Sequence, residues 1–146
     1  MKLISYLLIL LCGCQVSVSA QTFPANEPWT AQQLISAKYL AEKINANQTR
    51  NMLILGVGPD AMIKGSIDMG EANDPANIAK LKQFLKGVDK NKEVVIYCGC
   101  CPFDRCPNIR PAFKALKEMG FKNARLLNLT KNIRTNWLNE GYPIKD

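Results

Sequence analysis

Four of the six cysteines in this 146-residue chain lie in one short stretch, CGCCPFDRC, at residues 98–106. Thiols in such a stretch can bind a soft metal ion, exchange with disulfides or act as nucleophiles. Because the four lie so close together in sequence, no disulfide among them could join distant segments. The stretch therefore predicts local chemistry rather than a disulfide framework.

The spacing of these cysteines is compatible with both metal and redox chemistry. Cys98, Cys100, Cys101 and Cys106 could hold Cu(I) or Zn(II). However, the spacing is not that of paired C-x2-C motifs, and adjacent cysteines rarely both face one ion, so we predict no metal and no cofactor. Cys98 and Cys101 have C-x2-C spacing, as in thiol oxidoreductases, and Cys101 with Cys106 is a second redox or resolving pair.

Nucleophilic chemistry is the third interpretation, and we favour it. The chain has no histidine, which excludes catalytic triads and metal sites that need one. A thiolate can instead be stabilised by a helix N-terminus and a nearby cation. Cys98 precedes a helix expected to begin near residue 108, and Arg105 and Arg110 are the local cations.

Helical and strand patterns alternate along the chain. A helical pattern from Thr30 to Asn45 comes first, with Thr30 and Gln33 at the spacing of a capping box. Asp74 and Pro75 begin a second helix, and Gly120 ends a third. A last short helix is expected over NIRTNWLNEG. Buried strands are expected over NMLILGV, EVVIYC and ARLLNL. A short extended piece is expected in MIKGSIDMG.

This alternation predicts an α/β fold with a mainly parallel sheet. EVVIYC, which is apolar on both faces, is expected at the centre of that sheet. Sites in such folds form at the carboxyl ends of strands, and Cys98 falls at that point of the strongest strand.

Several segments resemble the second half of a rhodanese-like (sulfurtransferase) domain. That family has a strand ending in the catalytic cysteine, a helix ending in Gly-Phe or Gly-Tyr, a further strand, a tryptophan helix and Gly-Tyr-Pro. The matching residues here are VVIYC, Gly120-Phe121, ARLLNL, Trp137 and Gly141-Tyr142-Pro143. The resemblance covers about residues 28–145 and implies a three-layer fold with a mainly parallel central sheet flanked by helices.

The chain departs from the family pattern in both halves. Gly56 and Gly58 stand where the family has Asp and Arg, and Ser66 stands where its turn has histidine. The loop after Cys98 is about five residues longer than the usual pattern and has three extra cysteines.

The nucleophile is therefore open to three assignments. Strand register favours Cys98, whereas Cys100 has the C-x4-R spacing to Arg105 of a six-residue sulfurtransferase loop, and Cys101 is the third candidate. The C-x5-R spacing of related phosphatases is absent.

The resemblance implies sulfur transfer through a persulfide on Cys98, with Arg105 helping to bind a small anionic donor such as thiosulfate. The acceptor would be an unknown thiol or cyanide. The alternatives are a thiol-disulfide redox protein and a non-catalytic scaffold that binds a soft metal.

The N-terminus predicts export. MKLISYLLILL is a short basic start followed by an apolar run, and Val18 and Ala20 suit cleavage before Gln21. In the alternative, LCGC is a lipobox and Cys14 is lipidated, which would be the only attachment to a membrane. We therefore expect a periplasmic protein with a signal peptide at 1–20, a lead-in at 21–29 and the domain at 30–146.

The formal net charge of +7 comes from basic residues scattered along the chain. Most of them recur at helical or turn spacing and are expected to form solvated faces, and a general attraction for small anions is the functional alternative. No basic cluster is interleaved with aromatic residues, so we predict no nucleic-acid binding.

Overall fold

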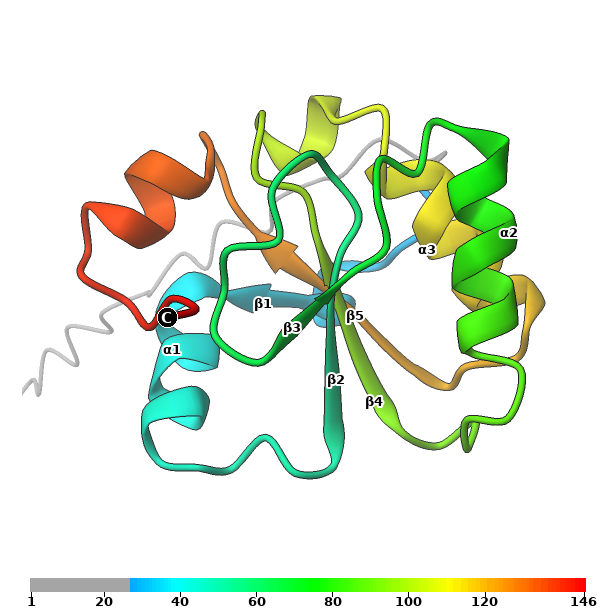
Figure 1. Ribbon diagram of the computed structural model, residues 1–146, viewed down its shortest axis with the longest axis horizontal. Coiled ribbons are helices and arrows are strands. Elements are labelled where there is room, and N and C mark those ends of the chain that lie inside the picture. The colour runs from blue at the N-terminus through cyan, green and yellow to red at the C-terminus, as the bar shows by residue number, and fades with distance from the viewer. Residues whose placement is uncertain (1–26) are drawn as a thin grey trace, which may run out of the picture.

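A five-stranded parallel sheet with the order β1-β5-β4-β2-β3 forms the centre of the structure (Figure 1). This is a computed structural model that describes residues 27–146, so the predicted signal segment and Cys14 lie outside the described residues, as does most of the lead-in. The strands are β1 (Leu34–Ser36), β2 (Met52–Gly56), β3 (Ser66–Asp68), β4 (Glu93–Tyr97) and β5 (Asn123–Asn128).

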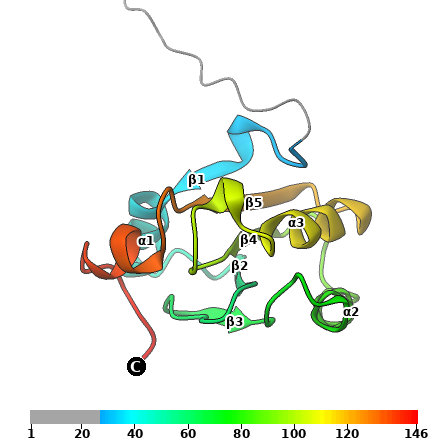
Figure 2. The same cartoon turned by 90° about the horizontal axis from the view of Figure 1, so that it is seen from above.

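Helices cover both faces of the sheet and make three layers (Figure 2). Helix α1 (Ala37–Asn45) and a short π-helical segment, η3 (Arg134–Leu138), lie on one face. Helices α2 (Pro75–Phe84) and α3 (Ile109–Glu118) lie on the other. Two short 3-10 segments, η1 (Ala31–Gln33) and η2 (Phe103–Arg105), complete the elements. The α/β class and the parallel sheet predicted from the sequence are confirmed.

Strand β4 lies between β5 and β2, and its side chains alternate between two cores. Val94 and Ile96 pack with α2 and α3, whereas Val95 and Tyr97 pack on the α1 face. Burial on both faces explains the continuous apolar run of this strand. Cys98 continues the alternation and enters the core beneath α3.

The expected starts and ends of the helices on the α3 face are confirmed. The Asp74 side chain accepts a hydrogen bond of 2.8 Å from the Ala76 N–H at the start of α2. After α3, Gly120 has a φ of +82°, a left-handed conformation that suits glycine.

The prediction of a helix starting at Thr30 is wrong. Gln33 does accept from the Thr30 N–H at 2.9 Å, but only the short η1 follows. The chain then extends as β1, which pairs in parallel with residues 126–128 of β5. Helix α1 starts afterwards at Ala37, where the Ser36 side chain accepts from the Tyr39 N–H at 3.1 Å. Pairing with a neighbouring strand has overridden the local helical pattern.

Within residues 27–146, none of the helices is long and apolar enough to cross a membrane.

Candidate functional site

Cys98 directly follows β4 at the carboxyl end of the sheet and is only 2% exposed. The loop after it is held at two points. The Gly99 carbonyl accepts a hydrogen bond of 2.9 Å from the Ile133 N–H, and the Phe103 N–H donates to the Leu129 carbonyl at 3.0 Å. These bonds fix the loop to the segment after β5, so that it folds back over the end of the sheet.

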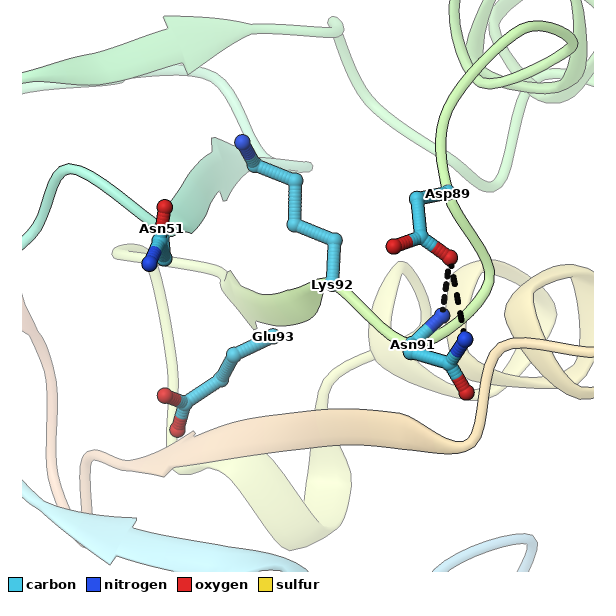
Figure 3. A pocket seen from close by; sticks show the side chains of 5 residues that line it. All are labelled: Asn51, Asp89, Asn91, Lys92 and Glu93. Atoms are coloured by element: carbon cyan, nitrogen blue, oxygen red, sulfur yellow. Dashed lines mark hydrogen bonds between the residues drawn. The ribbon is translucent and has the colours of Figure 1, made fainter.

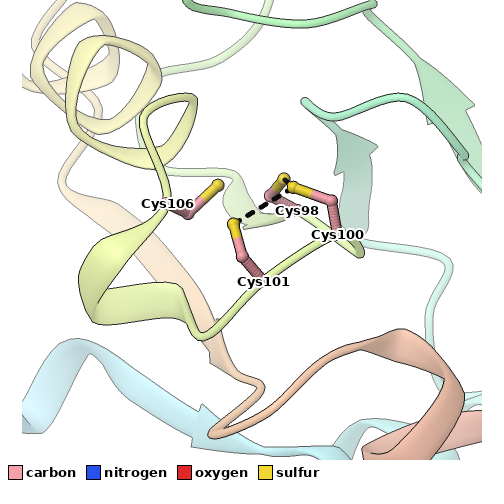
Figure 4. A group of neighbouring side chains, drawn as sticks. All are labelled: Cys98, Cys100, Cys101 and Cys106. Atoms are coloured by element: carbon pink, nitrogen blue, oxygen red, sulfur yellow. Dashed lines mark hydrogen bonds between the residues drawn. The ribbon is translucent and has the colours of Figure 1, made fainter.

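The loop brings the four predicted cysteines together (Figure 4). Their sulfur atoms all lie within 4.8 Å of one another. The Sγ atoms of Cys98 and Cys100 are 3.3 Å apart, and those of Cys100 and Cys101 are 3.1 Å apart. Cys98 and Cys106 are buried, Cys101 is half-buried and Cys100 is exposed, and all four are free thiols. The cluster therefore has a buried side and a side open to solvent.

Asn108 is a fifth member of the site, although the sequence pattern indicates only that a helix begins near it. Its Nδ2 donates a hydrogen bond to the Cys98 Sγ at 3.5 Å, and the residue is 1% exposed. Its Oδ1 accepts from the Asn73 N–H at 2.9 Å, which fixes the orientation of the amide. A buried asparagine one residue before α3 can thus position the Cys98 sulfur.

Two departures from the rhodanese-like pattern have a steric explanation. A Cβ atom added at Gly58 would lie 2.5 Å from the Cys98 Sγ. At Gly56 it would lie 2.7 Å from the Ala61 Cβ. Neither position has room for a side chain, so Gly58 allows the chain to pack closely against Cys98, and Gly56 allows the same against Ala61.

Ser66, at the position of the family's histidine, also has a defined contact. Its hydroxyl lies 2.9 Å from the hydroxyl of Tyr97, which in turn accepts from the Ile63 N–H at 3.2 Å. The contact ties the residue before Cys98 to the loop that leads into β3.

The hydrogen bonds in the cluster favour one thiolate, on Cys98. The neighbouring Cys106 thiol, whose effect outweighs that of burial, lowers the pKa of Cys98 to about 5, with further contributions from Asn108 and Cys100. Burial raises the pKa of Cys100 to about 12, with help from its contacts to Cys101 and Cys98. The bond to Cys98 is also the main cause that raises the pKa of Cys106. Cys98 thus ionises more readily than Cys100 and Cys106.

The two predicted cations differ in the contacts that their side chains make. Arg110 forms an ion pair with Glu27, and its guanidinium lies 5.6 Å from the centre of the Trp29 ring, so it holds the start of the described chain against α3. Arg105 is exposed in η2, and within residues 27–146 its side chain has no hydrogen bond or ion pair. Its role in binding an anion stays a prediction.

A polar pocket at the opposite end of the sheet is less suited to chemistry (Figure 3). It is lined by Asn51, Asp89, Asn91, Lys92 and Glu93, at the amino ends of β2 and β4. Asp89 accepts hydrogen bonds from Asn91 at 2.9 and 3.1 Å, which is a local turn contact. The cysteine cluster is therefore the stronger candidate site.

No protein-family model matches this chain, and no curated protein matches it. Solved structures do. The chain resembles EanB in complex with hercynine at a TM-score of 0.56 and 16% identity, over 77% of this chain and 27% of that one. It thus spans about a quarter of EanB.

Two shorter proteins match over most of their length. A protein from Lactobacillus plantarum has a TM-score of 0.57 and 20% identity, over 79% of this chain and 89% of that one. The Alr3790 protein from Anabaena sp. has a TM-score of 0.55 and 16% identity, over 76% and 90%. Together with the parallel sheet and its two helical layers, these similarities show that the chain has a rhodanese-like α/β fold.

Proposed function

We propose that this protein is an exported sulfurtransferase that carries sulfur as a persulfide on Cys98. One observation carries the proposal: the Cys98 sulfur lies at the carboxyl end of the central strand and is surrounded by donors that favour its thiolate. Such a thiolate is a nucleophile at neutral pH.

The reaction has two steps. The Cys98 thiolate attacks the outer sulfur of thiosulfate, the S–S bond of the donor breaks, and sulfite leaves with the electron pair. A thiol or cyanide then attacks the outer sulfur of the Cys98 persulfide. The new bond forms on the acceptor, and the Cys98 thiolate returns.

One solved structure supports persulfide chemistry on a fold of this kind. A variant of EanB has been determined with ergothioneine covalently linked with a persulfide cysteine, and its TM-score to this chain is 0.56. The sequence identity is 17%, so the similarity concerns the fold, and the chemistry is carried to Cys98 as part of the proposal.

The donor must reach a sulfur that is almost buried. Cys98 is 2% exposed, and the exposed Cys100 thiol lies 3.3 Å from it. We therefore expect the Cys100 side chain to swing aside when thiosulfate enters. Arg105, exposed in the same loop, is the cation that would attract the donor.

Export is the second part of the proposal. It rests on residues 1–20, whose basic start, apolar run and small residues before Gln21 have the pattern of a signal peptide. The mature protein would be periplasmic, and lipidation at Cys14 is the alternative form of processing.

Mass spectrometry of the intact protein tests the mechanism. The reduced protein, prepared anaerobically without metal, is treated with thiosulfate, and one added sulfur per chain is expected together with released sulfite. Cys98→Ser should abolish this uptake, whereas Cys100→Ser, the matched control in the same loop, should retain it.

Two results would contradict the proposal. Uptake that survives Cys98→Ser but not Cys100→Ser or Cys101→Ser would move the nucleophile. Loss of two hydrogens with no sulfur uptake would indicate a dithiol–disulfide protein instead.

A further inference from the structure

The four loop sulfurs lie close enough together to be compared with the spacing in a metal site. A tetrahedral Zn–S site with bonds of about 2.3 Å places its sulfurs about 3.8 Å apart. Here all four sulfurs lie within 4.8 Å of one another, and the two closest pairs are at 3.3 and 3.1 Å. Those two pairs need to separate by about 0.5 and 0.7 Å, and because the exposed Cys100 belongs to both, rotation of its side chain can supply this change.

The structure removes the main objection that the sequence raised against a metal. Adjacent cysteines rarely face one ion, yet the Sγ atoms of Cys100 and Cys101 lie 3.1 Å apart and are turned to the same side (Figure 4). The side chain of Cys106 points to them from the far end of the loop. All four thiols therefore converge on one point.

The two buried ligands are held firmly. Cys98 and Cys106 belong to the core under α3, where Phe103 and Ile109 pack with them. Cys100 is exposed and Cys101 is half-buried, so they cover this pair from the solvent side. An ion could enter from that side and then be enclosed, as in closed four-coordinate sites.

An outer partner is also in place. Ligands in metal sites are usually oriented by a second hydrogen bond. Asn108 provides one, because its Nδ2 donates to the Cys98 Sγ at 3.5 Å while its Oδ1 is held by the Asn73 N–H. With no histidine in the chain, the ligand set at this point is thiolate only, which soft ions prefer.

We propose that Cys98, Cys100, Cys101 and Cys106 form a four-thiolate site for a soft ion of the Zn²⁺ and Cd²⁺ class. Each thiol that binds gives its proton to solvent and forms one S–metal bond, and nothing is oxidised or reduced. Binding also occupies the Cys98 sulfur, so the loaded protein does not take up sulfur. The block of sulfur uptake rests on the proposed function, whereas the metal site itself does not.

Cadmium titration tests the site. Reduced, metal-free full-length protein is titrated with Cd²⁺ anaerobically, and the thiolate-to-cadmium absorption in the ultraviolet should saturate at one ion per chain. Cys106→Ser removes one of four ligands, so it should lower the absorption band by about a quarter. It should also weaken the affinity for Cd²⁺ by at least about tenfold, because even the loss of a residue that only hydrogen-bonds to a metal ligand costs that much. The double variant Cys12→Ser/Cys14→Ser is the matched control, and it should leave the absorption band and the affinity for Cd²⁺ unchanged.

Cys101→Ser makes the test independent of folding. Its side chain is half-buried, so the variant should keep the circular dichroism of the parent and still lose about a quarter of the band. A band that is absent, or unchanged in both Cys106→Ser and Cys101→Ser, would overturn the site.

Sulfur uptake separates the two proposals. The metal-free protein should gain one sulfur from thiosulfate, and the cadmium-loaded protein should gain none. Uptake without a cadmium band rejects the metal site alone, and a band without uptake by the metal-free protein rejects sulfur transfer alone. Equal sulfur uptake by the metal-free and the cadmium-loaded protein would show that metal binding does not block sulfur uptake at Cys98.

Discussion

At the scale of single residues, the Cys98 thiolate is stabilised by neutral donors rather than by a cation. Its sulfur lies 3.3 Å from the Cys100 sulfur and accepts from the Asn108 amide at 3.5 Å, and the Cys106 sulfur lies within 4.8 Å. Arg110 is engaged with Glu27, and the Arg105 side chain has no hydrogen bond or ion pair in residues 27–146. The site can thus hold one negative charge on a sulfur and still present exposed thiols to solvent.

The first prediction concerns the pH at which Cys98 ionises in the metal-free protein. Its pKa is lowered to about 5, so its reactivity with iodoacetamide should be constant near neutral pH and fall as pH drops through about 5. Cys106→Ala removes the largest cause of this shift and should move the fall to higher pH. Mass spectrometry of the alkylated Cys98 peptide gives the rate at each pH.

Asn108→Ala provides the graded comparison for this pH profile. Asn108 contributes less than Cys106 to the lowered pKa of Cys98, so the midpoint should move in the same direction by a smaller amount. An unchanged midpoint in Cys106→Ala would show that the donor to Cys98 is misassigned.

The second prediction tests the close approach beneath Cys98. In Gly58→Ala the new Cβ would lie 2.5 Å from the Cys98 Sγ and should push the sulfur aside. Sulfur uptake should slow by up to about a hundredfold, the scale of a 1 Å misplacement. The cost in unfolding free energy should be about 1–3 kcal/mol.

Gly87→Ala is the matched control for this substitution. Nothing lies within 4 Å of a Cβ at that position, so both uptake and stability should stay close to those of the parent. Thiosulfate uptake and urea unfolding measure the two effects, and equal behaviour of the variants would argue against the steric role of Gly58.

At the scale of elements, the carboxyl end of β4 places neighbouring side chains on opposite faces of the sheet. Tyr97 packs on the α1 face while Cys98 enters the core under α3. The Tyr97 hydroxyl, whose pKa is raised by burial, is bonded to Ser66 and to the Ile63 N–H. These bonds join β4 to the turn before β3, with β2 between the two strands, and so brace the strand end that holds Cys98.

The third prediction is the cost of losing this brace. Tyr97→Phe keeps the ring but leaves the Ile63 N–H without its partner, and we expect a loss of about 1–3 kcal/mol in unfolding free energy. Tyr39→Phe is the control, because Tyr39 is 41% exposed, and its change should stay within about 0.5 kcal/mol. Urea unfolding followed by circular dichroism measures both, and similar losses would refute the role of the hydroxyl.

The elements also show which features the sequence could predict. β2 and β4 were predictable because each is a nearly continuous buried run, and β5 because Leu126 and Leu127 give it an apolar centre. Helices α2 and α3 were predictable because proline marks the start of the first and glycine the end of the second. β1 has three residues, too few to show a period, and its pairing with β5 depends on contacts 92 positions away in the chain, as between Leu34 and Leu126.

The candidate site was predictable where it depends on residues that are close together in the sequence. The four cysteines lie within nine positions in sequence, and their position after the central strand indicated where they lie. Asn108 and Gly58 were missed as parts of the site because their contacts with the Cys98 sulfur depend on how the start of α3 and the segment after β2 pack against Cys98.

At the scale of the whole molecule, the parallel sheet gives the protein two unlike ends. The carboxyl ends of the strands carry the thiols and the exposed Arg105, while the amino ends carry the polar pocket around Glu93. The chain has a formal net charge of +7, which favours the approach of an anionic donor from any direction. However, only a positive charge close to the thiols should attract the anionic donor while it reacts with the Cys98 sulfur.

The last prediction separates this local effect from the general one. Arg105→Gln should slow the reaction with thiosulfate by about threefold, equivalent to about 0.7 kcal/mol for one exposed charge, and added salt should reduce the difference. Arg50→Gln removes the same charge just before β2, at the other end of the sheet, and should change the rate far less. Neither variant should alter the rate with neutral iodoacetamide, because that rate depends on the thiolate and not on anion attraction. Equal slowing by both substitutions would assign the attraction to net charge and leave Arg105 without a specific role.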